Sequence, residues 1–112
     1  MAINFETANP QALLAAFKKA IDEGHVVTWS YDANGNFTHT PSQWKDEAVL
    51  RPSIYTGWLV MNFYRRKSDK TSPGLYAVYH GRFIESMLAH CDKLFSNGTA
   101  TSMPTNADRL AA

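Results

Sequence analysis

Apolar residues recur at intervals of three and four in two stretches of the chain, a spacing that places them on one face of a helix. In the first stretch they are Leu13, Leu14, Phe17 and Ile21. Asn9 and Pro10 precede this stripe, and an asparagine N-cap followed by proline is a favourable helix start. Gly24 follows it and readily takes the left-handed conformation that ends helices. The pattern predicts a helix over residues 10–23.

The second stripe lies nearer the C-terminus, and Asn97-Gly98 then favours a helix end. Its members are Phe83, Ile84, Met87, Leu88, Cys91, Leu94 and Phe95. We predict a second amphipathic helix here, with Leu88 and Cys91 among its buried residues.

Two stretches rich in β-forming residues, 25–31 and 37–40, flank the dipeptide Asn34-Gly35. Both residues of this dipeptide tolerate positive φ angles, as tight hairpin turns require. We therefore predict a first hairpin around it.

Residues 57–64 alternate strictly and are predicted to form a strand with one apolar and one mixed face. The apolar face carries Leu59, Met61 and Phe63, and the mixed face carries Trp58, Val60, Asn62 and Tyr64. The polar stretch 65–74 follows as a loop, and residues 75–80 are predicted to be its return strand.

A Thr-Pro-Ser-Gln sequence at residues 40–43 has the form of a capping box, which predicts a short helix over residues 41–48. Residues 49–55 stay ambiguous, because Pro52 cannot donate a hydrogen bond within a central strand.

The expected fold is α+β, a two-layer sandwich with an antiparallel sheet of about four strands and two main helices on one face. The expected order is helix, two strands, short helix, two strands, helix. We expect a single domain over residues 1–98. The tail, residues 99–112, could add a short edge strand at 99–103 and then fray.

Composition places the chain among ordinary globular proteins, with 112 residues of which 45% are hydrophobic. A single cysteine, Cys91, cannot form an internal disulfide. The N-terminus lacks the apolar run of a signal peptide, and no apolar run is long enough for a membrane span. A cytoplasmic protein without membrane contact is expected.

Charge is distributed unevenly along the chain. Residues 51–82 carry six basic side chains against one acid, an excess of five positive charges. Residues 1–50 carry three basic side chains against six acids, an excess of three negative charges. The formal net charge of +1 therefore conceals a dipolar molecule, which bears on the partners that its surface can meet.

The basic segment is the main candidate contact surface. It consists of Arg65, Arg66, Lys67 and Lys70, with Tyr64 and Tyr76 expected beside it on neighbouring strands. Such a surface suits a protein partner, especially an acidic one, and aromatics beside arginines can also bind nucleic acid. An isoelectric point near 7.9 and the lack of an RNA-binding motif make nucleic acid the second choice. A solvated loop that keeps a hairpin from aggregating is the alternative without function.

Histidine and arginine at a strand-to-helix junction form a second candidate. His80 and Arg82 could bind an anion at a helix start, or His80 could simply be a polar cap. A small enzyme with a site around His39, His80 and Arg82 is a third reading, since convergence in space is invisible in one sequence. The four histidines have no metal-binding spacing, so no metal or cofactor is expected.

Neither a nucleophile motif nor a paired acid points to catalysis. The expected function is therefore binding of another macromolecule, most of all a protein, in an accessory, regulatory or inhibitor-like role. Aromatic residues on the mixed face of the sheet also suggest a homodimer.

Overall fold

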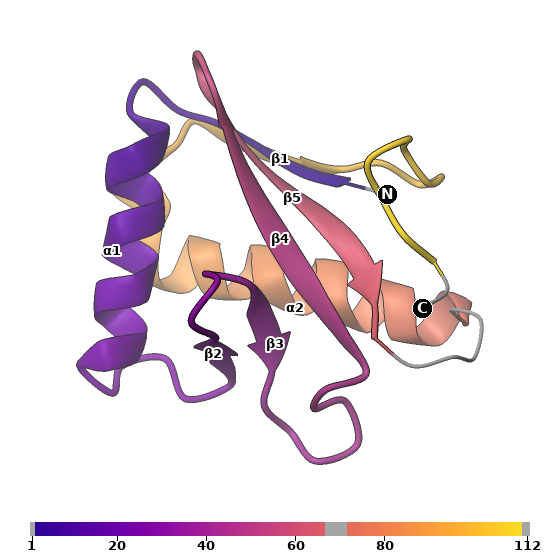
Figure 1. Ribbon diagram of the computed structural model, residues 1–112. Coiled ribbons are helices and arrows are strands. Elements are labelled where there is room, and N and C mark those ends of the chain that lie inside the picture. The colour runs from indigo at the N-terminus through magenta and orange to yellow at the C-terminus, as the bar shows by residue number, and fades with distance from the viewer. Residues whose placement is uncertain (1, 67–71, 111–112) are drawn as a thin grey trace.

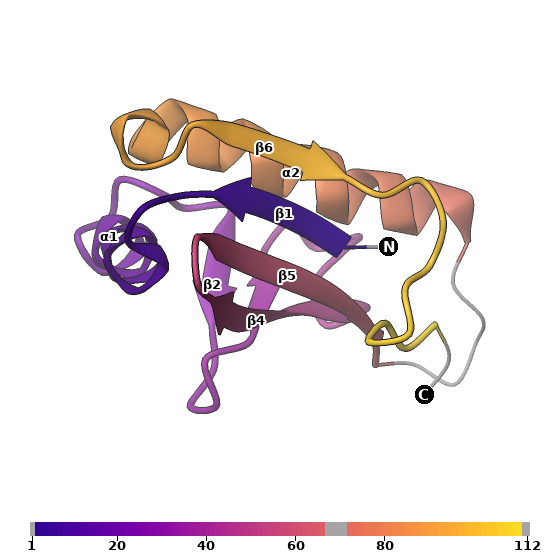
Figure 2. The same ribbon diagram turned by 90° about the horizontal axis from the view of Figure 1, so that it is seen from above.

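The computed structural model describes residues 2–66 and 72–110, in which two helices pack against one face of an antiparallel sheet (Figures 1 and 2). In chain order the elements are β1 (Ala2–Glu6), α1 (Pro10–Asp22), β2 (Trp29–Tyr31), β3 (Phe37–His39), β4 (Ala48–Tyr55), β5 (Trp58–Arg65), α2 (Pro73–Cys91), the short 3₁₀ helix η1 (Asp92–Leu94) and β6 (Asn97–Ala100). No helix in the described ranges is both long and apolar enough to cross a membrane.

The sheet has six strands in the order β2-β3-β4-β5-β1-β6. β1 is first in sequence but lies between β5 and β6, pairing antiparallel with both. β5 is longer than β1, so the last residues of β5 have no partner on β1. They lie beside the C-terminal segment, where Tyr64 and Arg109 form a parallel bridge. Figure 2 shows the chain after β6 curving past the start of β1 to reach the end of β5. Both ends of the described chain therefore take part in the sheet.

The expected α+β class and the two helices are confirmed, but the sheet has six strands rather than about four, and the element order differs. β1 was not expected at all. β6 (Asn97–Ala100) begins two residues before the edge strand expected at 99–103, so it spans the expected domain limit at residue 98.

The return strand expected at residues 75–80 is wrong, because these residues belong to α2. Ser72 caps this helix: its hydroxyl accepts a hydrogen bond from the backbone N–H of Leu75 at 3.1 Å. Pro73 then occupies the first helical position, where a missing N–H costs nothing. The second helix therefore begins ten residues before Phe83, the first residue of the expected stripe.

The short helix expected at residues 41–48 is also wrong, since turns occupy most of this range and β4 begins at Ala48. Asp46 has a φ angle of 61°, a left-handed conformation that interrupts helices. The ambiguous residues 49–55 prove to lie in β4, with Pro52 opposite Met61 of β5. β3 pairs with β4 only at Leu50, so Pro52 lies beside an open edge, where a proline is tolerated.

The core lies between the sheet and the two helices, and aromatic rings dominate it. The ring of Phe83 is central, with centroids of other rings 5.0 to 6.1 Å away. These neighbours are Phe5, Phe17, Trp29 and Phe37. The expected burial of Leu59, Met61 and Phe63 is confirmed, whereas Leu88 is 54% exposed and was wrongly placed in the core.

Candidate functional site

The face of the sheet opposite the helices, here called the outer face, carries exposed aromatic side chains. Tyr55 and Trp58 are cross-strand neighbours at the β4–β5 turn, and they are 58% and 40% exposed. Trp58 is also opposite Glu6 of β1. This end of the outer face therefore presents two large aromatic side chains to solvent.

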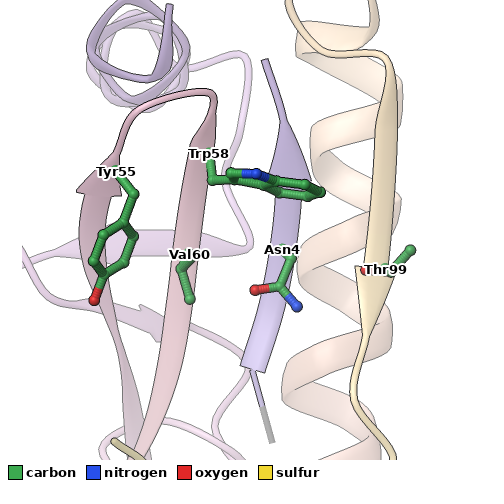
Figure 3. A pocket seen from close by; sticks show the side chains of 5 residues that line it. All are labelled: Asn4, Tyr55, Trp58, Val60 and Thr99. Carbon is green, nitrogen blue, oxygen red and sulfur yellow. The ribbon is translucent and has the colours of Figure 1, made fainter. Parts of the chain in front are cut away.

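Next to these aromatics lies a hollow of about 350 Å³, here called the outer hollow, which opens to solvent. Its lining residues are Asn4, Tyr55, Trp58, Val60 and Thr99 (Figure 3). In the strand register Asn4 is opposite both Val60 and Thr99, so these three side chains form a row across β5, β1 and β6. Figure 3 shows the indole of Trp58 reaching from β5 across β1, while the ring of Tyr55 stands on β4.

The outer hollow combines apolar walls with two polar groups. Among the described residues, neither the side-chain amide of Asn4 nor the hydroxyl of Thr99 has a hydrogen-bond partner. The outer hollow can therefore take an apolar group against Trp58, Tyr55 and Val60, while a polar atom of the same ligand bonds to the amide or the hydroxyl.

Farther along the same face, two exposed guanidinium groups lie over one tyrosine. The guanidinium carbons of Arg51 and Arg109 are 5.4 and 5.6 Å from the centroid of the Tyr64 ring, within the range of cation–π attraction. We call this set the arginine cluster. Arg51 is opposite Asn62, four residues along β5 from Trp58, which corresponds to about 14 Å.

Arg109 is held in place by the residue before it. The carboxylate of Asp108 accepts hydrogen bonds from the Asn62 side chain at 3.0 Å and from the Phe63 N–H at 2.9 Å. Its second oxygen accepts from the N–H and the hydroxyl of Thr105. Burial raises the pKa of Asp108, and its backbone hydrogen bonds oppose part of that rise. These contacts fasten the C-terminal segment to β5 and place Arg109 beside Tyr64.

The basic segment predicted as the contact surface is used in part within the chain. Arg65 is buried and donates to the carboxylate of Glu47 at 2.9 Å. Arg66 is exposed and pairs with Asp32 at 3.0 Å. Lys67 and Lys70 lie outside the described residues. Of the predicted tyrosines, Tyr64 lies on the outer face, whereas Tyr76 does not.

Tyr76 and His80 form a buried stack one helical turn apart in α2. Their ring centroids are 3.7 Å apart, and the Tyr76 hydroxyl donates to the carbonyl of Thr101 at 3.0 Å. The Nδ1 atom of His80 lies 2.8 Å from the Tyr76 carbonyl oxygen. His80 is thus inside the helix rather than at its start, which removes the helix-terminus geometry on which the anion site with Arg82 was based.

His39 and Arg82, in contrast, meet at a second hollow of about 350 Å³, here called the histidine hollow. It lies between α2 and the turn after β3, and His80 is not among its lining residues. Its lining includes Thr28, His39, Trp44, Arg82 and Glu85. The three residues expected to form an enzyme site are therefore brought together only in part.

Sequence reasoning missed Asn4, Thr99 and Arg109 as surface residues, since their strand partners were unknown. Among the described residues, no group of three or more histidine, cysteine or acidic side chains could hold a metal ion. Comparisons of the chain with protein-family models, with curated proteins and with solved structures found no match.

Proposed function

We propose that this chain is a protein-binding module whose contact surface is the outer face of the sheet. The observation that carries the proposal is the outer hollow, which Trp58 and Tyr55 border on a face that no helix covers. Buried aromatic anchors that fill pockets contribute most of the affinity at protein interfaces. A hollow of about 350 Å³ that is open to solvent suits one large side chain of a partner.

The arginine cluster supports an acidic partner. Arg51 and Arg109 are both exposed and lie at the same end of the outer face. A partner that places an apolar side chain in the outer hollow would need a carboxylate farther along the same face to reach them. The module would thus recognise an apolar anchor and an acid at a fixed separation.

Nucleic acid is the second candidate, because exposed aromatics on a sheet flanked by arginines can stack bases. Glu6 argues against it. Glu6 is opposite Trp58, and hydrogen bonds from Asn97 and Ser96 lower the pKa of its carboxyl group. An ionised carboxylate beside the most exposed indole would repel the phosphates that accompany a stacked base.

The test begins with a photo-crosslinking amino acid at position 58, expressed in the native host. Position 88 is the matched control, since Leu88 is exposed to a similar degree but lies on α2. We expect a protein crosslink from position 58 that position 88 does not give. A second copy of this chain or a nucleic acid in that crosslink would overturn the proposal in favour of a homodimer or a nucleic-acid module.

The purified partner then allows a quantitative test. Trp58→Ala should weaken binding by about thirtyfold, the loss typical of an anchor residue, and Leu88→Ala should not change it. Replacing Arg51 and Arg109 by alanine should slow association and reduce its dependence on salt. Equal affinity of Trp58→Ala and the native chain would show that the outer hollow is not the contact surface.

A further inference from the structure

The histidine hollow contains a histidine whose protonation pattern the structure defines. The Nδ1 atom of His39 lies 2.7 Å from the backbone carbonyl oxygen of Thr28. A carbonyl oxygen can only accept a hydrogen bond, so Nδ1 carries the hydrogen and donates it. Burial lowers the pKa of His39 and favours the neutral ring. The other ring nitrogen, Nε2, therefore has a free lone pair.

This lone pair faces the histidine hollow. His39 is only 4% exposed, and it is one of the residues that line the hollow. Within the described chain, Nε2 has no hydrogen-bond partner, yet it is not among the buried polar atoms that solvent cannot reach. Nε2 is thus an acceptor that a hydrogen-bond donor in the hollow can reach.

Arg82 supplies a cation to the same hollow. Its guanidinium pairs with Glu85 on the same helix at 3.5 Å, and both side chains are largely exposed. Exposed ion pairs at this spacing contribute little, so Arg82 can turn to another anion at small cost. Glu85 also lines the hollow and would repel a ligand of high negative charge.

The walls of the histidine hollow are held by contacts that do not involve these groups. The Tyr79 hydroxyl donates to the carbonyl of Trp44 at 2.6 Å, and the Thr40 hydroxyl donates to the carbonyl of Val27 at 2.8 Å. The turn after β3 is thereby tied to α2 and to the segment before β2. The acceptor and the cation therefore face a hollow that is already formed.

We propose that the histidine hollow binds a small monoanion that carries a hydroxyl group, of the hydroxycarboxylate class. The hydroxyl donates to Nε2 of His39, and the carboxylate is bound by the guanidinium of Arg82. This site is separate from the outer face and does not depend on the protein-binding role proposed for it.

The test uses lactate as the probe and propionate as its matched control, because the two differ by one hydroxyl group. Binding is followed by NMR through the ¹⁵N resonances of His39 in the labelled protein. We expect the spectrum of the free protein to show a proton on Nδ1. Lactate should shift Nε2 in a saturable way and bind about tenfold more tightly than propionate, the ratio that one net hydrogen bond provides.

Variants distinguish the roles of the two charged residues. Arg82→Gln should abolish saturable binding, and it should fold normally because this side chain is exposed. Glu85→Gln should strengthen lactate binding, since it removes a repelling charge. Lys19→Gln on α1 is the control, and it should change neither lactate binding nor folding. A proton on Nε2, equal binding of lactate and propionate, or unchanged binding in Arg82→Gln would each overturn the proposal.

Discussion

The hydroxyl of Tyr79 donates a hydrogen bond of 2.6 Å to the backbone carbonyl of Trp44, which ties α2 to the turn between β3 and β4. The Thr38 hydroxyl lies 3.1 Å from the same phenol oxygen. A single buried hydroxyl on α2 thus contacts both β3 and the turn that follows it, which lie 41 and 35 residues away in sequence. This hydrogen bond also fixes the position of the turn between β3 and β4, which contains no helix.

The first prediction concerns this hydroxyl. Tyr79→Phe should lower the free energy of unfolding by about 1–3 kcal/mol, because it leaves the Trp44 carbonyl without its donor. Tyr55→Phe is the matched control, and a change within about ±0.5 kcal/mol is expected since Tyr55 is exposed. Urea denaturation of both variants measures the difference. Equal curves for the two would mean that the contact does not contribute to stability.

The second prediction concerns the aromatic core. Phe83→Ala should cost about 3–5 kcal/mol, since removing the central ring opens a cavity among four other aromatic rings. Leu88→Ala, on the same helix but exposed, should change stability by no more than about 0.5 kcal/mol. Chemical denaturation again provides the measurement. A large loss for Leu88→Ala would contradict the orientation of α2 described above.

The third prediction follows from the lowered pKa of His39. Burial is the largest cause; Arg82 lowers the pKa further, while the hydrogen bond to Thr28 and the charge of Glu85 oppose this change. A folded-state pKa below 6.5 means that the unfolded chain binds a proton more readily at this position. The contribution of His39 to stability is therefore fully present above pH 6.5 and is lost as the pH falls toward the folded-state pKa.

Unfolding free energies measured from pH 8 to pH 5 test this dependence. His39→Gln should weaken the decrease on acidification, whereas His90→Gln, at an exposed position, should keep it. If both variants retained the same dependence on pH, the stability loss would have to come from other groups.

The fourth prediction concerns Cys91, which is 3% exposed within the core. Burial raises the pKa of its thiol, and the charge of Asp92 raises it further. Since the thiolate is the reactive form, labelling of the native protein by a thiol reagent should be at least about tenfold slower than labelling in denaturant. Similar rates in the two conditions would show that Cys91 is accessible.

Local sequence signals were sufficient to predict an element whose own periodicity and ends are clear. The helix expected at residues 10–23 and the strand expected at 57–64 correspond to α1 and β5, because each has strong periodicity and clear ends. The same kind of start signal, however, led to opposite outcomes elsewhere. Ser72-Pro73 begins a helix of nineteen residues, while Thr40-Pro41 begins only turns.

What decides between these outcomes is the apolar surface that follows. The residues after Pro73 form an apolar stripe that packs on the sheet. The segment after Pro41 is mostly polar, and Trp44 is its single large apolar side chain. Helices in proteins depend more on such packing than on propensity. The outer hollow was not predicted, although its residues Trp58 and Val60 were placed on the mixed face, because it needs β1 and β6 beside β5. Those pairings link segments that are far apart in the sequence.

The central place of β1 has a consequence for the order of folding. During synthesis β1 leaves the ribosome before its sheet partners, because β5 follows it by more than fifty residues and β6 comes after β5. β6 joins the sheet only through β1. Ile3 and Phe5, which are fully buried in the finished molecule, must therefore remain without their partners on β5 until that strand has been made. Loop closure over such distances is slow. The sheet is thus completed only after β6 has been made, and a growing chain that stops before β6 leaves one edge of β1 open to pairing with other chains.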